Sequence, residues 1–119
     1  MKRKLSPAEQ KVADQAREAY EAIAAELTDA VDIVPAKMMG MPCIKIRGKL
    51  AVGFYIDAMT FKLAGAQHAA ALALPGAKLF DPSGVGRAMK EWVQVPFAQR
   101  ARWRELAQAS LDYVGGSAG

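Results

Sequence analysis

The chain has 119 residues, of which 52% are hydrophobic and 24% charged, a balance that excludes an intrinsically disordered protein. A chain of this length is expected to fold as one domain around a single core, with residues 1–5 and 115–119 as flexible tails. The formal net charge is +4, but three of the sixteen basic residues lie in the first four positions, so the charge only weakly indicates an acidic partner.

The first predicted element is a helix that begins at Ser6-Pro7-Ala8-Glu9. The Ser6 hydroxyl can cap a free backbone N–H, proline is tolerated at the first helical position, and Glu9 can reach back to complete a capping box. Apolar residues then recur at helical spacing: Val12, Ala16, Ala19, Tyr20, Ile23 and Leu27. Arg17 and Glu21, four residues apart on the other side, are expected to pair in solvent.

From Ile33 to Leu63 the apolar period changes from that of a helix to two, which predicts strands. Ile44 and Ile46 alternate with polar neighbours, and a second alternating series contains Leu50, Val52, Phe54 and Ile56. Short connections at residues 47–49 and 57–58 predict an antiparallel meander with one apolar face that needs cover.

The rest of the chain is predicted as a short helix, a hairpin and a final helix. Residues 64–74 are rich in alanine and stop at Pro75-Gly76, and residues 77–80 and 89–95 read as strands around a turn-rich loop at 81–87. Pro96 is expected to open the last helix, whose apolar stripe is Trp103, Leu106, Ala107, Ser110, Tyr113 and Val114. This order predicts an α+β fold in two layers, an antiparallel sheet covered by helices.

Several segments of the chain together resemble the N-terminal domain of the TfoX/Sxy family of competence regulators. The first runs from Lys37 to Lys49 and continues through Gly53-Phe54-Tyr55 to Phe61-Lys62-Leu63. The others are Leu74-Pro75-Gly76-Ala77, Asp81-Pro82, residues 89–96 and Trp103, so the resemblance covers residues 30–107. It implies a secretion-chaperone-like α+β domain of bacterial type with a regulatory or protein-interaction role and no known reaction. The MmcQ/YjbR-like proteins are a more distant comparison.

Cysteine content and hydropathy suggest a location and exclude some kinds of site. Cys43 is the single cysteine and His68 the single histidine, so neither an internal disulfide nor a Cys/His metal cluster is expected. The N-terminus lacks an apolar signal core, and no apolar run approaches the ~20 residues of a membrane span. We therefore expect a cytoplasmic protein that does not enter a membrane and holds no cofactor.

Three features carry weak chemical signals, and each has a structural explanation. Cys43 and His68 could form a thiolate and base, but nothing in the sequence brings them together. The sulfur atoms of Met38, Met39, Met41 and Cys43 would suit Cu(I), although alternation along a strand would separate them and methionine commonly fills core gaps. Residues 83–87 could cradle an anion, but they lack the spacing of a phosphate-binding loop and fit a hairpin turn.

Two surfaces are candidates for binding. Charged residues within predicted strands indicate either a guarded sheet edge or a partner surface anchored by Trp92, and this surface comprises Met39, Lys62, Arg87, Lys90, Glu91 and Trp92. Arg100 and Arg104, with Arg102 between them, are the best basic patch for nucleic acid. The leading interpretation is a non-catalytic regulatory or interaction domain that binds a protein partner or itself as a homodimer. The alternatives are a nucleic-acid-binding module and an unrecognised enzyme.

Overall fold

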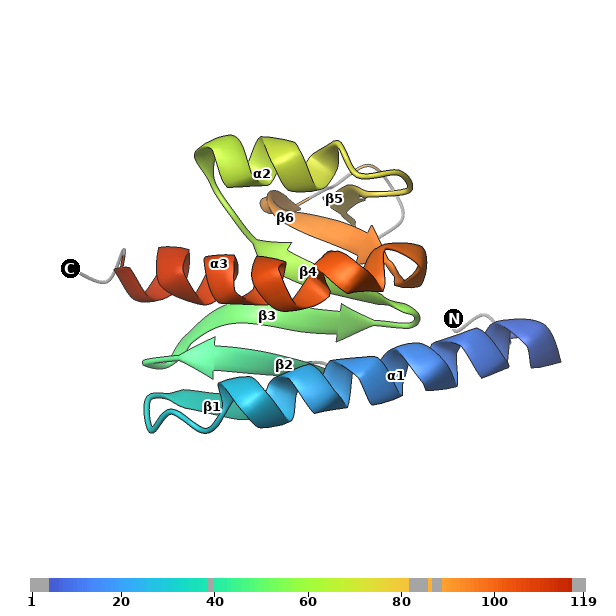
Figure 1. Ribbon diagram of the computed structural model, residues 1–119, viewed down its shortest axis with the longest axis horizontal. Coiled ribbons are helices and arrows are strands. Elements are labelled where there is room, and N and C mark those ends of the chain that lie inside the picture. The colour runs from blue at the N-terminus through green and yellow to red at the C-terminus, as the bar shows by residue number, and fades with distance from the viewer. Residues whose placement is uncertain (1–4, 39, 82–85, 87–88, 117–119) are drawn as a thin grey trace.

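The computed structural model describes residues 5–38, 40–81, 86 and 89–116 (Figure 1). Its helices are α1 (Pro7–Leu27), α2 (Gly65–Leu72) and α3 (Trp103–Gly116), with a 3₁₀ helix, η1, at Phe97–Arg102. Its strands are β1 (Ile33–Met38), β2 (Met41–Ile46), β3 (Lys49–Tyr55), β4 (Ala58–Lys62), β5 (Lys78–Phe80) and β6 (Met89–Pro96). All pairs are antiparallel in one sheet of order β1-β2-β3-β4-β6-β5, which confirms the predicted α+β class.

Helix α1 begins as its sequence predicts. The Glu9 amide donates to Ser6 Oγ at 3.1 Å, and the Ser6 amide donates to Glu9 Oε1 at 2.9 Å, so the capping box is complete. Ala16, Tyr20 and Leu27 of the apolar face are buried, whereas Val12 is 37% exposed. Figure 1 gives the reason, since the N-terminal part of α1 extends past the sheet.

All three helices pack into one hydrophobic core on the same face of the sheet (Figure 1). Helix α1 contributes Tyr20, whose ring lies 5.2 Å from that of Phe54. The fully buried Trp103 of α3 donates its indole N–H to the Val95 carbonyl at 3.2 Å, which ties α3 to β6. Leu111 is buried on the same stripe, although the sequence pattern did not include it.

The methionine-rich run is a hairpin rather than a single strand. Strands β1 and β2 pair Met38 with Met41, and Gly40 between them has a φ of +83°, which favours glycine. The predicted alternation of residues 38–43 along one strand is therefore wrong. Met39 lies outside the described residues.

The last helix begins and ends at later residues than the sequence predicts. Pro96 is the last residue of β6, and the segment after it forms η1 before α3 starts at Trp103. Gly115 and Gly116 were expected in a flexible tail but form the end of α3, where Gly115 is buried and its carbonyl accepts from Arg47 Nη1 at 3.2 Å. This contact holds the last turn of the helix.

Both edges of the sheet are poor templates for an added strand. Strand β1 carries Pro35, which has no backbone N–H, and the Ile33 amide is already bonded to the Ala30 carbonyl at 3.1 Å. Strand β5 has only three residues. Strands β4 and β6 lie inside the sheet, so the interpretation of Lys62 and the Lys90–Trp92 segment as a guarded sheet edge is wrong.

Candidate interaction surface

The structure brings Lys62 and Glu91 together and adds a third residue, Tyr113 of α3. The Tyr113 hydroxyl donates to Glu91 Oε2 at 2.7 Å, and Lys62 Nζ lies 3.8 Å from Glu91 Oε1. The Leu63 amide also donates to the Glu91 carbonyl at 2.9 Å. These contacts join β4, β6 and α3 at one end of the sheet and fix the Glu91 carboxylate in place.

The electrostatics of this cluster follow from the hydrogen bond. The Glu91 carboxylate accepts a hydrogen bond from the neutral phenol and would repel a phenolate, so it raises the pKa of Tyr113 above its ordinary value of about 10. Tyr113 is therefore a neutral donor at physiological pH. Sequence analysis missed this pair because the two residues are 22 positions apart and on different elements.

Lys90 lies beside α2. The His68 Nε2 atom is 2.8 Å from the Lys90 carbonyl oxygen, and because a carbonyl can only accept, Nε2 carries the proton in this contact. Helix α2 is thereby attached to β6 at Lys90. The Lys90 side chain is exposed.

Trp92 does not anchor an exposed partner surface, which was its expected role. Its side chain is only 7% exposed, so it contributes to the packing of the sheet and does not offer a ring to a partner. Met39 and Arg87, the remaining members of the predicted surface, lie outside the described residues. Among the described members of the predicted surface, Lys62, Lys90 and Glu91 therefore form the accessible part.

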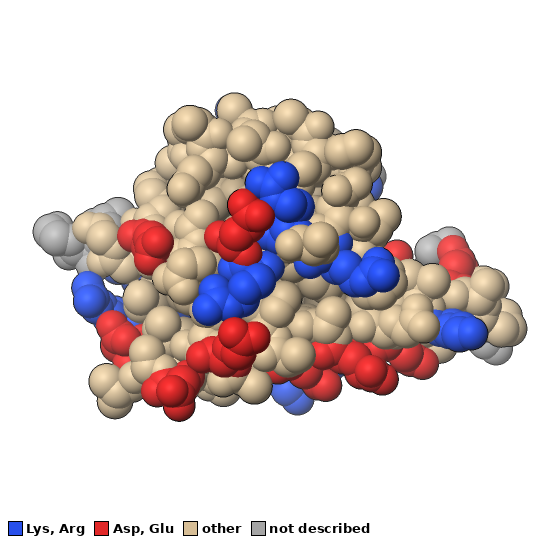
Figure 2. Space-filling view, in the orientation of Figure 1, with Lys and Arg blue, Asp and Glu red and all other residues tan. Residues whose placement is uncertain are grey.

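The surface next to these residues is uncharged. Residues 63–77 form the longest run in the sequence without Lys, Arg, Asp or Glu, and this run contains all of α2. Its exposed side chains are mostly apolar, with Gln67 a polar exception: Ala66, Ala69, Ala70 and Leu72 in the helix and Ala73 at its C-cap. In Figure 2 the top of the molecule, where α2 lies, is tan, whereas charged side chains gather over α1 and α3. The uncharged run is visible in the sequence, although only its alanine content entered the prediction of a helix there.

The predicted basic patch is largely neutralised. Arg104 Nε lies 3.3 Å from Glu26 Oε1 of α1, and Arg102 makes two hydrogen bonds with Glu105 at 2.7 and 3.0 Å. Arg100 instead lies over the Phe97 ring, 4.3 Å from its centroid. Figure 2 shows the resulting mixture of blue and red side chains over α3 and α1. A mixed surface of this kind attracts phosphates much less than a basic one.

The structure separates the residues that were considered for catalysis. Strands β3 and β4 lie between β2, which carries Cys43, and β6, to which His68 is bonded, so the two strands are about 14 Å apart. Burial raises the pKa of the Cys43 thiol, which disfavours the thiolate. Within the described part of the chain, no three His, Cys, Asp or Glu residues form a group that could hold a metal ion.

None of the helices in the described residues has the length and apolar character needed to cross a membrane. Comparison of the chain with protein-family models, with curated proteins and with solved structures gives no match.

Proposed function

We propose that this chain is a small regulatory or protein-interaction domain that binds through the exposed face of α2. We define the α2 face as Ala66, Ala69, Ala70, Leu72 and Ala73. The observation that carries the proposal is that this face is exposed, apolar and free of charge in a protein where about a quarter of the residues are charged. Contiguous apolar surface of this kind marks interaction sites more often than ordinary solvent-exposed surface.

The surroundings of the α2 face have the anatomy of an interface. Interfaces commonly have an apolar centre and a polar rim that remains accessible to water. Lys90, which is exposed and whose carbonyl is bonded to His68 of α2, would supply such a rim, with Glu91 next to it in β6 and held by Tyr113 and Lys62. A fixed carboxylate costs less conformational entropy on binding than a free one.

We propose a second copy of the chain as the occupant of the α2 face. Two copies with a net charge of +4 repel each other over most approaches, but two uncharged faces can meet without that penalty. The guarded edges at Pro35 and at β5 disfavour dimerisation by strand addition. A face formed by one short helix buries less than a standard interface, so the dimer is weak and depends on concentration.

The resemblance of residues 30–107 to the TfoX N-terminal domain supports a regulatory role from the sequence side. The single cysteine, which cannot form an internal disulfide, supports a reducing, cytoplasmic location. No observation on the described surface favours nucleic acid over protein as the partner.

The test is sedimentation velocity of the wild type, Ala69→Glu and Ala25→Glu over a wide range of concentration. Ala69 is exposed on α2, and Ala25 is an alanine on α1 that is also exposed, so the second variant is a matched control. We expect the wild type and Ala25→Glu to dimerise, and Ala69→Glu to do so at least about tenfold more weakly because two carboxylates would face each other. A wild type that stays monomeric would contradict the second copy as occupant. Loss of dimerisation in Ala25→Glu alone would contradict the α2 face.

A further inference from the structure

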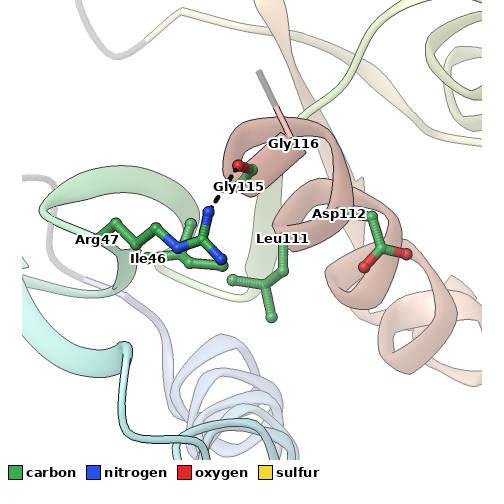
Figure 3. A pocket seen from close by; sticks show the side chains of 6 residues that line it. All are labelled: Ile46, Arg47, Leu111, Asp112, Gly115 and Gly116. Atoms are coloured by element: carbon green, nitrogen blue, oxygen red, sulfur yellow. Dashed lines mark hydrogen bonds between the residues drawn. The ribbon is translucent and has the colours of Figure 1, made fainter. Parts of the chain in front are cut away.

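A shallow depression lies on another part of the molecule, between the β2–β3 turn and the last turn of α3 (Figure 3). Its volume is about 290 Å³, and it is lined by Ile46, Arg47, Leu111, Asp112, Gly115 and Gly116. Figure 3 shows the Arg47 guanidinium beside Ile46 and above Leu111, with the Asp112 carboxylate turned away from it. The depression thus combines an apolar floor with the Arg47 guanidinium and, on its far side, the Asp112 carboxylate, whose Oδ1 accepts from Gln108 Nε2 at 3.0 Å.

Arg47 occupies an unusual position for its residue type. It is the first of two turn residues between β2 and β3, and both Arg47 and Gly48 have positive φ angles, of 52° and 81°. Turns of this geometry favour Asn, Asp or Gly at the first position, because a larger side chain is strained there. The chain nevertheless places its longest cationic side chain at this point, which indicates that the guanidinium is needed there.

The guanidinium is held in place by an ion pair with Asp32, which also offsets part of its charge. Arg47 Nε lies 3.1 Å from Asp32 Oδ2, and Nη1 donates to the Gly115 carbonyl at 3.2 Å. A guanidinium has five N–H donors, so these contacts leave donors that can face the depression. An arginine fixed in this way loses little side-chain entropy when it binds an anion, and its planar fork matches a carboxylate.

We propose that this depression binds a monocarboxylate with a small apolar body, with Arg47 as the anion-binding residue. The carboxylate would pair with the guanidinium, and the apolar body would cover Ile46 and Leu111. A volume of about 290 Å³ is at the low end for ligand sites, which selects a small ligand. The same chemistry is offered by a free organic acid and by the C-terminal carboxylate of a peptide. This site is independent of the α2 face.

The test is a titration followed by two-dimensional ¹H–¹⁵N NMR spectra of the wild type. The probes are benzoate and N-acetylphenylalanine, each compared with its neutral amide. We expect saturating shifts of the Arg47, Leu111 and Gly115 amide signals with a Kd of about 1–10 mM for the acids, and about tenfold weaker binding for the amides. Tighter binding of N-acetylphenylalanine than of benzoate would identify a peptide C-terminus as the source, and the reverse a free acid.

Two variants separate the site from general anion binding. Arg47→Lys keeps the charge but loses the planar fork, and we expect at least about fivefold weaker binding of both acids. Arg100→Lys is the control, because Arg100 is an exposed arginine with an aromatic neighbour, and it should bind as the wild type does. Equal binding of acids and amides by the wild type, shifts that do not saturate, or unchanged affinity in Arg47→Lys would each overturn the proposal. Failure here leaves the proposed function of the α2 face unaffected.

Discussion

Replacing Ser110 with alanine is expected to stabilise the protein, although most substitutions in a core do the opposite. Ser110 lies on the inner stripe of α3 and is fully buried, with 0% of its surface exposed. Its hydroxyl has no hydrogen-bond partner among the described residues. The folded state therefore carries the cost of desolvating a polar group that gains nothing in return.

The magnitude follows from three contributions. An unpaired buried hydroxyl costs about 1–3 kcal/mol, and serine is about 0.5 kcal/mol less favourable than alanine inside a helix. Removing one oxygen leaves a small void that costs about 0.3–0.5 kcal/mol. The net expectation is a free energy of unfolding higher by about 1–3 kcal/mol, which for 119 residues raises Tm by about 4–12 °C.

The assay is urea unfolding followed by tryptophan fluorescence, since Trp92 and Trp103 are both buried in the folded state. The matched control is Ala107→Ser, which places a hydroxyl at a fully buried position on the same stripe and should destabilise the protein by about 1–3 kcal/mol. A Ser110→Ala variant that is less stable than the wild type by more than about 0.5 kcal/mol would refute the reasoning, because the hydroxyl would then have a stabilising partner.

Three further predictions concern other parts of the fold. Gly53→Ala should lower the free energy of unfolding by about 1–3 kcal/mol in the same assay, because its new Cβ would lie 2.6 Å from Thr60 Oγ1; an unchanged stability would show that the strands can separate there. Ser6→Ala should lower the free energy of unfolding by about 1 kcal/mol, because it removes the capping box, and thermal unfolding would measure this change. An unchanged stability would mean that the start of α1 frays in solution. Tyr113 should ionise above pH 10 in an ultraviolet titration, and Glu91→Gln should return its pKa toward 10. Because the raised pKa belongs to the folded state, the hydrogen bond stabilises the protein fully below about pH 10, and this contribution is lost as pH rises through the folded pKa. Identical titrations of wild type and Glu91→Gln would contradict the contact.

Local patterns predicted most elements, because capping residues and apolar periods are properties of short segments. The Ser6 cap and the period-two run through Phe54 and Phe61 correspond directly to α1 and the sheet. The exposure of Val12 could not be predicted, because periodicity describes which side of a helix is apolar, not how far the sheet extends beneath it. The burial of Trp92 similarly depends on the position of β6 between β4 and β5, which only the whole strand order gives.

Only part of the candidate surface could be predicted, because the rest depends on contacts between elements that are far apart in the sequence. Lys62 and Glu91 stood out as charged residues within strands, but the contribution of Tyr113 depends on how α3 crosses the sheet. Arg104 is neutralised by Glu26, which lies 78 positions away in the sequence, so no local pattern could predict this ion pair. The uncharged run at 63–77, in contrast, is visible in the sequence and needed only to be compared with the charge of the remaining chain.

The most direct test of the central claim is a dilution series of ¹H–¹⁵N spectra, recorded from the highest soluble concentration downward. If the α2 face joins two copies, amide signals that move with concentration should belong to residues 63–77 and to Lys90 and Glu91, and those of β1 and the exposed side of α1 should stay fixed. Concentration-dependent shifts confined to β1 or α1, or spectra that do not change at all, would contradict the account.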